Sequence, residues 1–497
     1  MSEPKNSVQM DISLLITRAA IGFLAGMGIA AWMGEDARVL ALLFSALGIA
    51  YISIDRKWAN ATGTVAILLT VWSGIFLYTR ELIHWQTLPE TVDFSGPVEI
   101  IERGEIRGLY RPVTLRPVGD WHGGDILYRA PVDFDRVAGE RLDFRCALTR
   151  PKNFEPGFDY RLLLASRDIG YTCEWGGQSV WLSSGGYSFR QQLAGIQSGF
   201  REAIIRLLPE PEAGLLTGLL IGGSDRLTPE MKNAFARAGL SHIVAVSGYN
   251  MSVVAEGIVI LALILGLWRR WAVGLAIIGL AGFLLIIDGS AASLRAAFMA
   301  WLAFGAYFAG RPAASWNGLL IAGVLMLVLN PLLIRYDVGF QLSFLATAAL
   351  LVFVRAYETF DFFRHWYGAV SALFLTTLII ELFTLPVLTS NFGTFSIIAP
   401  LANALILPLV PVAMFVGIAM LALVAIFPSL GFLCGLLSWL PLTMIIRLTE
   451  GLAILPGASL SGLDTGTMFA VLWYIGLGIA VFGFEQLRQR YVLGVDH

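Results

Sequence analysis

Polar and ionisable side chains interrupt a segment of membrane-length apolar character between Gly214 and Glu256. Hydroxyl, imidazole and carboxylate groups are those of nucleophilic and acid–base catalysis. His242 and Ser247 lie five positions apart, which turns them about 140° away from each other on a helix, so a Ser–His nucleophile within this segment is disfavoured. Lipid is a poor solvent for such groups, so we expect the segment to face protein or water. The side chains concerned are Ser241, His242, Ser247, Asn250 and Glu256.

Metal and nucleotide motifs give no support for other chemistry. The 5 histidines form no HxH, HExxH or Cys/His pair at metal-ligand spacing, so we expect no metal site. Gly222-Gly223-Ser224-Asp225 lacks the context of a phosphate-binding loop, so ATP hydrolysis is not expected. We therefore expect no cofactor and no enzymatic activity.

The composition is that of a polytopic membrane protein. Of the 497 residues, 57% are hydrophobic and only 14% are charged, against about 25% charged in soluble domains, and the mean hydropathy is +0.72. Three apolar runs come first, and Arg56 and Lys57 between the second and third indicate that both the N-terminus and this loop are cytoplasmic. The pattern Gly22-Phe23-Leu24-Ala25-Gly26 in the first run is a plausible helix-packing face. The three runs are 12–33, 39–54 and 61–78.

Later runs bring the expected total to about twelve spans, with both termini cytoplasmic. The run 397–427 is long and contains Pro400, Pro408 and Pro411, so we expect it to be broken or re-entrant.

Residues 85–185 differ from the rest, because short runs of alternating apolar and polar residues are separated by Gly, Pro and Asp. This pattern predicts a small antiparallel all-β domain, such as an OB-like barrel, on the extracytoplasmic side. Examples of the predicted strands are 97–102, 125–129 and 141–146. Cys146 and Cys173 both lie here; they could form a disulfide outside the cytoplasm or remain two separate thiols.

Two surface features of this region leave alternatives open. Arg103, Arg107, Arg111 and Arg116 could form a basic stripe for nucleic acid or belong to a solvated mixed surface. Apolar residues recur at helical spacing in 187–208, which predicts a helix that either lies at the membrane interface or packs on the β domain.

A short helix precedes the polar span. Thr228 is the expected N-cap, Pro229 stands in the first turn, and Gly239 suits the end of the helix. Ser241 is expected to cap the next helix, the fourth span, which ends at Arg269 and Arg270.

Ionisable and amide side chains occur inside several other apolar runs. Asp288 and Arg295 are seven positions apart, so they could share one helix face in a cavity. The alternatives are a structural ion pair or side chains that extend to the outer membrane interface. Glu381 could pair with Arg295, line a pore or be a buried protonated carboxyl.

Asn330, Asn391 and Asn403 could join helices by hydrogen bonds or line a pore, and Asn403, beside the proline-rich break, is expected to line a pore. Gln341 is a further polar residue within an apolar run.

Several motifs resemble the ComEC competence-protein family. Gly239-Leu240-Ser241-His242-Ile243-Val244-Ala245-Val246-Ser247-Gly248, preceded by Gly222-Gly223-Ser224-Asp225-Arg226-Leu227, is similar to the family signature. Further similar segments are 154–160 in the β region, 293–299, 337–346 and 391–408, so the resemblance spans about residues 95–410 in consistent order. Many members read Ser-Gly-Leu-His where this chain reads Ser247-Gly248-Tyr249-Asn250. Many members also carry a metallo-β-lactamase-like domain with an HxHxDH metal motif, which the sequence to His497 does not contain, so we do not expect this chain to degrade a strand itself.

The resemblance implies a channel that passes single-stranded transforming DNA across the bacterial inner membrane. On this interpretation the channel-lining residues are His242, Ser247, Tyr249, Asn250, Glu256, Asp288, Arg295, Gln341, Glu381 and Asn403. Arg226, Lys232 and Arg237 are the expected phosphate contacts, and Tyr249 is expected to stack on bases. The implied partners are single-stranded DNA, a DNA receptor on the outer face, a cytoplasmic helicase-type ATPase, a separate nuclease and membrane lipid.

Two other function classes stay open. The first is a secondary transporter or channel for a small polar or anionic solute, for which Asp288, Arg295 and Glu381 are suited. The second is an intramembrane hydrolase using Ser247 or His242 with a partner from another span. The expected organisation is an N-terminal membrane region (1–84), the OB-like domain (85–185), interfacial helices (186–240) and a channel domain of about nine spans (241–497).

Overall fold

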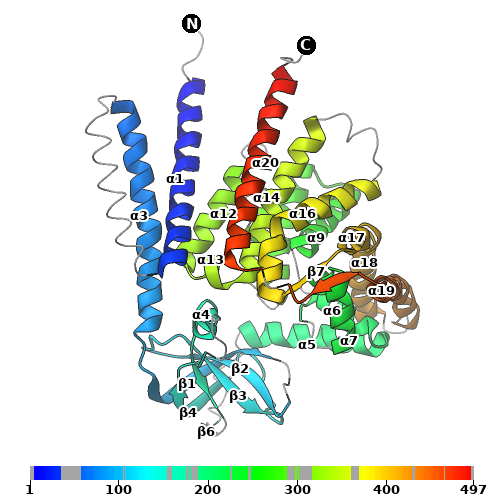
Figure 1. Ribbon diagram of the computed structural model, residues 1–497. Helices are drawn as coiled ribbons and strands as arrows, with labels where there is room; N and C mark the ends of the chain where they lie inside the picture. Colours follow the sequence, from blue (N-terminus) through cyan, green and yellow to red (C-terminus); the bar gives the residue numbers. More distant parts are fainter. Residues whose placement is uncertain are drawn as a thin grey trace. The chain divides into compact units, whose positions relative to one another are not determined.

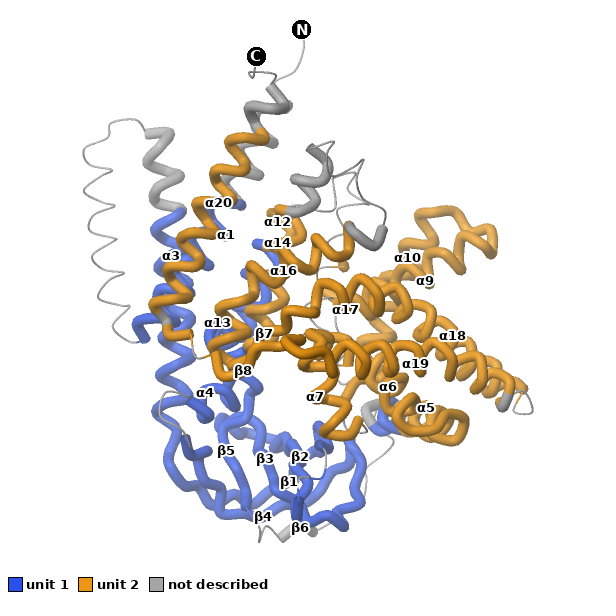
Figure 2. The backbone as a smooth tube through the Cα atoms, turned by 45° about the vertical axis from the view of Figure 1, so that its right-hand side comes forward, with its two compact units in different colours: residues 1–195, 320–337 blue, residues 196–319, 338–497 orange. Residues whose placement is uncertain are grey.

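The computed structural model consists mainly of helices, with one small β-barrel (Figure 1). It describes residues 5–34, 58–104, 106, 108–153, 159–174, 178–180, 189–223, 227–244, 248–287, 297–298, 300–301, 316–359, 369–427, 431–463 and 465–493. The chain forms two compact units, one of residues 1–195 and 320–337 and the other of residues 196–319 and 338–497 (Figure 2).

The first unit contains the barrel and two long helices, the second of which leads into the first strand of the barrel. Its two long helices, α1 (Lys5–Met33) and α3 (Trp58–Gln86), lie side by side (Figure 1). A Cβ atom on Gly26 would overlap the carbonyl of Val71, and one on Gly74 would overlap the carbonyl of Phe23. The predicted packing face of Gly22 and Gly26 is therefore confirmed, because only glycine lets the two backbones come this close. The second predicted span, 39–54, lies outside the described residues.

The barrel closes because strand β1 pairs with both β2 and β4. The order is β1-β2-β3-β5-β4, with β4 returning to β1; all pairs are antiparallel except β3–β5, and β6 adds to β4. Alternate residues such as Val98, Leu115, Ile126 and Phe144 fill the interior. The predicted strands are confirmed. The bounds are β1 Thr91–Arg103, β2 Tyr110–Pro117, β3 Asp125–Pro131, β4 Arg141–Thr149, α4 Tyr160–Ala165, β5 Ile169–Cys173, β6 Gln178–Val180 and, later in the chain, α13 Leu333–Tyr336.

The second unit is a helical bundle with a two-stranded sheet, β7–β8. The long apolar run breaks after Ile406, where α17 ends, and α18 begins at Leu409, which confirms the predicted interruption. Helices α5 (Phe189–Leu207) and α12 (Trp316–Leu329) are divided between the units. The other bounds are α6 Glu212–Leu220, α7 Pro229–Arg237, α8 Ser241–Val244, α9 Gly248–Ile264, α10 Arg269–Ile286, α14 Val338–Thr359, α16 Ala369–Phe392, β7 Thr394–Ser396, α17 Ala399–Ile406, α18 Leu409–Ile426, α19 Gly431–Ala453, β8 Ser459–Ser461 and α20 Thr467–Leu493.

Helix α5 is amphipathic, as its sequence predicts. Ile204 and Leu208 pack into the core of the helical unit, whereas Ile196 and Phe200 stay exposed. Gln197 donates a hydrogen bond to the carbonyl of Ile286, at the end of α10, at 2.6 Å.

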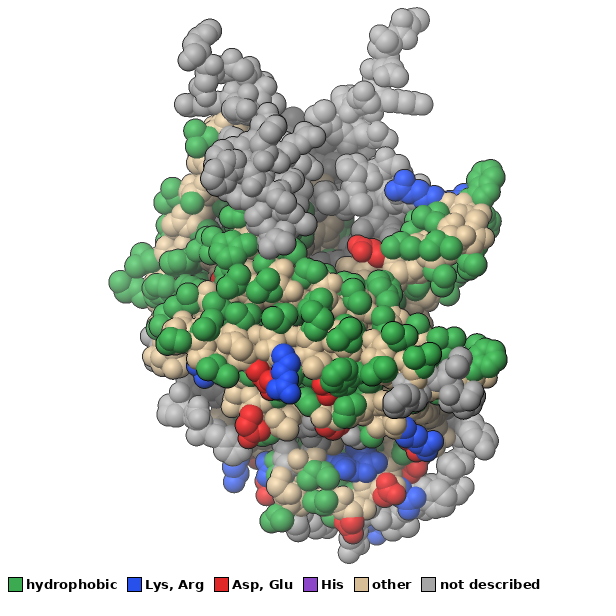
Figure 3. Space-filling view, turned by 90° about the vertical axis from the view of Figure 1, so that its right-hand side faces the viewer, with side chains coloured by type: hydrophobic (Ala, Val, Ile, Leu, Met, Phe, Trp, Pro, Cys, Tyr) green, Lys and Arg blue, Asp and Glu red, His purple; other side chains and the backbone are tan. Residues whose placement is uncertain are grey.

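Five helices among the described residues are long and apolar enough to cross a membrane. They lie at Arg269–Ile286, Ala372–Phe392, Leu409–Ile426, Leu433–Ala453 and Met468–Arg488. Hydrophobic side chains form a broad band across the face shown in Figure 3. Such apolar surfaces are stable in lipid but not in water. The chain is therefore a membrane protein. The predicted total of about twelve spans stays a prediction, because residues 35–57, 288–296, 302–315 and 360–368 are not described.

Candidate functional site

The short helix α7 begins and ends as its sequence predicts. The Thr228 hydroxyl accepts a hydrogen bond from the backbone N–H of Met231 at 3.2 Å, and Pro229 stands in the first turn. Met231 and Phe235 are buried, while Asn233 and Arg237 are exposed. Gly239 has a φ of 73°, the left-handed conformation that glycine adopts without strain.

Close packing fixes α7 against the elements after α16. A Cβ atom on Gly239 would overlap the side chain of Ala399 at the start of α17. The Ser396 hydroxyl in β7 donates a hydrogen bond of 2.7 Å to the carbonyl of Arg237. The end of α7 is therefore fixed by two contacts, the close packing of Gly239 on Ala399 and the hydrogen bond from Ser396 in β7.

Helix α6 is the buried centre of this unit, since every residue from Glu212 to Leu220 is buried. Its one carboxylate, Glu212, accepts a hydrogen bond of 2.6 Å from the Thr443 hydroxyl in α19. The fully buried Asn250 in α9 donates its amide to the carbonyl of Leu219 at 3.2 Å. Asn250, one of the predicted lining residues, thus lies in the packed interface between α6 and α9.

An exposed polar stripe runs along the opposite side of α9. Gly248, Ser252 and Glu256 are all exposed and recur every four residues, so they share one helix face. Ser241 and His242 in the preceding α8 are exposed as well. We call Gly248, Ser252 and Glu256 the α9 stripe. A carboxylate on an exposed face of an apolar helix is costly in lipid, so this face requires water or a polar partner.

Two further predicted lining residues lie near the break between α17 and α18. The Tyr249 hydroxyl donates a hydrogen bond of 3.1 Å to the carbonyl of Leu407, which stands in that break. Asn403 is buried, and its side-chain oxygen accepts no hydrogen bond in the described structure. A buried amide oxygen without a donor is uncommon, because its desolvation is then uncompensated.

The remaining predicted lining residues fall in two groups. Gln341 in α14 and Glu381 in α16 are half-buried. Of the predicted phosphate contacts, Lys232 is half-buried and Arg237 is exposed, both on α7. Ser247, Asp288, Arg295 and Arg226 lie outside the described residues, so their predicted roles and the predicted pairing of Arg295 with Asp288 or Glu381 stay predictions.

In the barrel, Cys146 and Cys173 form a disulfide that joins β4 to the end of β5, with Cα atoms 6.3 Å apart. The arginines of the predicted basic stripe are engaged elsewhere. Arg116 makes a two-point hydrogen bond to Asp125 at 2.9 and 2.8 Å, Arg103 pairs with Asp135 at 3.7 Å, and Arg111 donates to the carbonyl of Phe134. Arg107 is not described. The mixed solvated surface is the alternative that these contacts favour.

The barrel contains several groups whose pKa is shifted, among them Asp168 and Tyr171. Partial burial, and then the neighbouring carboxylate of Asp125, raise the pKa of Asp168 above its ordinary value. Burial also raises the pKa of Tyr171, whose hydroxyl donates to the carbonyl of Pro89 at 3.2 Å. Within the described part of the chain, no three His, Cys, Asp or Glu side chains gather to hold a metal ion.

Sequence reasoning missed two residues, Ser252 and Trp473. Ser252 could have been found from its position, since it lies four residues from both Gly248 and Glu256 and therefore shares their helix face. The second is the Trp473 ring N–H in α20, which donates at 2.8 Å to the carbonyl of Leu382, four residues before Pro386 in α16. Proline has no N–H for that carbonyl, so another helix supplies the donor.

Comparison with known proteins identifies the family. Residues 219–487, more than half of the chain, match the family profile described as Competence protein. The chain belongs to this competence-protein family, as its motifs predict. It is 26% identical over 310 residues to ComE operon protein 3 of Bacillus subtilis (strain 168), an alignment that covers 60% of this chain but 38% of that protein. No solved structure matches the chain.

Proposed function

We propose that this chain forms the channel through which single-stranded transforming DNA crosses the bacterial inner membrane during natural competence. The α9 stripe is the observation that carries the proposal. It lies within the region that matches the competence family and gives an apolar helix a face unsuited to lipid. A translocated single strand needs an aqueous route with polar walls and some cationic groups.

In this proposal α7 and α8 stand at the outer entrance, where Arg237 and Lys232 meet phosphate groups and His242 begins the lining. Glu256, Gln341, Glu381 and Asn403 line the route with Ser247, Asp288 and Arg295. Tyr249 and Asn250 fix α9 to its neighbouring helices on the side away from the α9 stripe, a role consistent with their hydrogen bonds to Leu407 and Leu219. Arg226 is the third phosphate contact.

The barrel is an OB-like domain on the extracytoplasmic side, with both chain termini cytoplasmic. Five closed strands with β3 parallel to β5 support the OB-like assignment, and a disulfide supports an oxidising compartment. The chain is not itself an enzyme in this proposal. A receptor delivers DNA from outside, a cytoplasmic helicase-type ATPase pulls the strand, and a separate nuclease removes its complement.

Uptake of labelled single-stranded DNA into liposomes that contain the purified chain tests this function. Arg237→Glu and Arg295→Glu should each reduce uptake while the protein remains folded, because each places a carboxylate where the strand needs a cation. Arg447→Glu is the matched control, since Arg447 is exposed in the same unit but outside the proposed route.

Three results would contradict the proposal. Unchanged uptake in Arg237→Glu and Arg295→Glu would remove the proposed cationic contacts. Transport of a small anion in place of DNA would favour the solute transporter. Cleavage of DNA or peptide by the purified chain, lost on changing Ser247 or His242, would favour the intramembrane hydrolase.

A further inference from the structure

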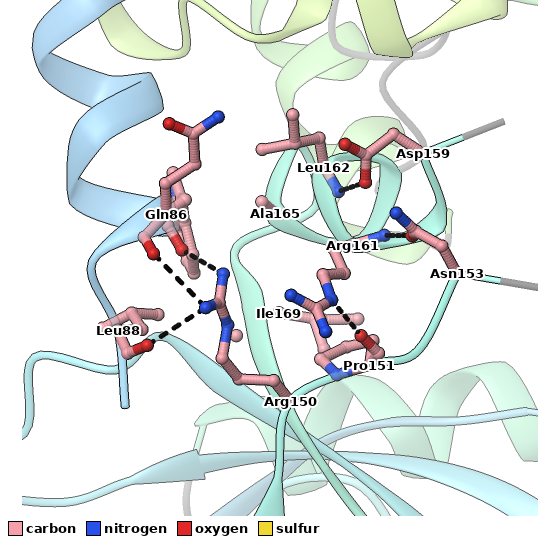
Figure 4. Close-up of a pocket in the computed structure, with 12 residues that line it drawn as sticks. Gln86, Leu88, Arg150, Pro151, Asn153, Asp159, Arg161, Leu162, Ala165 and Ile169 are labelled. Carbon is pink, nitrogen blue, oxygen red and sulfur yellow. Dashed lines mark hydrogen bonds between the residues drawn. The ribbon is translucent and has the colours of Figure 1, made fainter. Parts of the chain in front are cut away.

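A polar pocket of about 170 Å³ lies in the first unit, where α3 meets the barrel (Figure 4). Trp85 and Gln86 at the end of α3, Arg150 after β4, and Asp159 and Arg161 at the start of α4 contribute to its lining. A single water molecule needs only roughly 10–15 Å³ of such space, so the pocket has room for a group the size of a phosphate. It belongs to neither the α9 stripe nor the barrel interior.

Arg150 enters the pocket from the barrel and stabilises the end of α3. Its guanidinium donates to the carbonyls of Trp85 at 2.8 Å, Leu88 at 3.1 Å and Gln86 at 3.3 Å (Figure 4). Its side chain is only 10% exposed. A cation at the carbonyl end of a helix is favourable, which explains why this arginine is held here.

Arg161 faces the pocket from α4. The Asp159 carboxylate accepts the backbone N–H of Leu162 and so starts this short helix, which fixes the direction of Arg161. The Arg161 Nε donates to the carbonyl of Pro151 at 2.7 Å, and the backbone N–H of Arg161 donates to the Asn153 side chain at 3.1 Å. The two guanidinium groups therefore face the same space from different elements (Figure 4).

One exposed carboxylate, Glu90, lies between the two arginines. Its contacts are long, at 3.3 Å to Arg150 and at 3.3 and 3.5 Å to Arg161, and its side chain is 65% exposed. Ion pairs of this kind contribute little and rearrange easily. Glu90 is not among the residues that line the pocket, so its carboxylate pairs with the two arginines without filling this space.

Both guanidinium groups retain unused donors. A guanidinium has five N–H groups. In the described structure Arg161 uses Nε–H and one hydrogen on each terminal nitrogen, while the Nε–H of Arg150 meets no acceptor. The lining also contains one carboxylate, Asp159, but one of its oxygens already serves Leu162. Fork-shaped donors that converge on a free space are suited to the oxygens of a phosphate group.

The position of the pocket along α3 indicates whether its phosphate ligand would come from a lipid headgroup or from a molecule in solution. The predicted third span, 61–78, ends at Tyr78. Gln86 lies eight residues further along α3, a rise of about 12 Å. The headgroup layer on one side of a bilayer is only about 5–8 Å thick. With the span placed as predicted, the pocket lies beyond the level of lipid phosphates.

We propose that Arg150 and Arg161 form a binding site for a phosphodiester group of an incoming single strand, with Glu90 as a carboxylate that competes for the same two guanidinium groups. The proposal rests on the DNA-translocation function proposed above and adds to it a contact at the root of the barrel. The site holds the strand by its backbone, so it carries no sequence preference.

The test measures binding of a short fluorescent thymidine oligonucleotide to the full chain in nanodiscs of zwitterionic lipid. Arg161→Gln should weaken binding about three- to tenfold at low salt and lower the slope of log K against log salt by about 0.7 for the lost phosphate contact. Glu90→Gln should strengthen binding by about two- to fivefold, because it removes the competing carboxylate. Arg150 is left unchanged, since its loss would also release the end of α3.

A second ion pair of the barrel supplies the matched controls. Arg129 and Glu174 meet at 3.1 Å with side-chain exposures of 29% and 68%, close to the 34% and 65% of Arg161 and Glu90. Arg129→Gln and Glu174→Gln should therefore leave binding and its salt slope unchanged. A purely structural role for Arg161 and Glu90 predicts lower stability in both variants and no opposite changes in affinity.

Four outcomes would overturn the proposal. The first is that Arg161→Gln and Glu90→Gln change binding no more than the controls. The second is competition by inorganic phosphate at a pocket to which the oligonucleotide does not bind. The third is loss of oligonucleotide binding when anionic lipid is added, which would assign the pocket to a headgroup. The fourth is DNA uptake by liposomes without any oligonucleotide binding at this site, which would overturn the proposed phosphodiester site but not the channel function. If uptake were absent as well, both proposals would be overturned.

Discussion

Polar groups find their partners in different ways in the barrel and in the membrane helices. In the barrel, Arg116 and Asp125 meet through two short hydrogen bonds, and the arginine remains partly open to solvent. In the helical unit, Asn250 has a backbone carbonyl as its partner. Both regions contain buried side-chain atoms without a hydrogen-bond partner in the described structure, among them Arg111 Nε and Glu140 Oε2 in the barrel and Asn403 Oδ1 in the helical unit. Water can complete the shell of a barrel side chain, whereas a group in the bilayer depends on protein.

The two regions are therefore stabilised by different interactions, and an exposed polar group has a different meaning in each. The barrel closes its sheet, fills one core and is cross-linked by a disulfide. The helices instead rely on close backbone approach and on single hydrogen bonds between helices. An exposed carboxylate such as Glu256 is unremarkable on a barrel but calls for an aqueous route on an apolar helix.

Removing the barrel disulfide should produce the largest change. The bond closes a loop with a sequence separation of 27, for which the loop-entropy estimate is about 3–4 kcal/mol. The double variant Cys146→Ala/Cys173→Ala should unfold at a clearly lower temperature. The unfolding midpoint of this variant should not change when reductant is added, whereas the midpoint of the unchanged chain should fall. Equal midpoints for the two proteins without reductant would show that the barrel does not depend on this bond.

The glycine contact between α1 and α3 should give the next largest effect. Gly26→Ala should cost about 1–3 kcal/mol, because the new methyl group overlaps the Val71 carbonyl and separates the helices. Gly28→Ala, two residues away with no neighbour near its Cβ position, should be neutral or slightly stabilising. Thermal stability of the detergent-purified chain measures both, and similar losses in the two variants would contradict the close-packing account.

The hydrogen bond opposite Pro386 should be worth about 1 kcal/mol. Trp473→Phe removes the donor to Leu382 and should lower stability by this amount. In a Pro386→Ala background the loss should nearly vanish, because residue 386 then supplies its own N–H. Trp439→Phe is the control, because this partly exposed ring N–H donates to no acceptor in the described part of the chain. Equal losses from Trp473→Phe in both backgrounds would rule out this coupling.

The smallest effect concerns Asp168. Its pKa is raised by partial burial and by Asp125, so its contribution to stability is present below the ordinary pKa of 3.8 and is lost as pH rises through the higher folded value. Asp168→Asn keeps a residue that tolerates the φ of 64°. The variant should melt slightly higher than the unchanged chain at pH 7, and the difference should shrink toward pH 4. A difference that grows as pH falls would reverse the assigned sign.

Local signals predicted the local structure well. The alternation in 97–102 and 141–146 predicted strands, Thr228, Pro229 and Gly239 predicted the bounds of α7, and the three prolines predicted the break before α18. Contacts over long sequence distances could not be predicted in this way. Nothing in the sequence shows that Asn250 turns toward Leu219 while Glu256 is exposed, or that Arg150 reaches the end of α3, because these depend on how helices and strands pack.

Thiol accessibility along α9 tests the central claim most directly. In a Cys434→Ala background, Ser252→Cys is treated in liposomes with a membrane-impermeant thiol reagent, and single-stranded DNA uptake is measured afterwards. Leu261→Cys, on an exposed apolar position, and Val253→Cys, on a buried one, are the controls. The account predicts that only Ser252→Cys is labelled and that labelling blocks uptake. Labelling of Ser252→Cys no faster than Leu261→Cys, or labelling without loss of uptake, would contradict an aqueous DNA route along this helix.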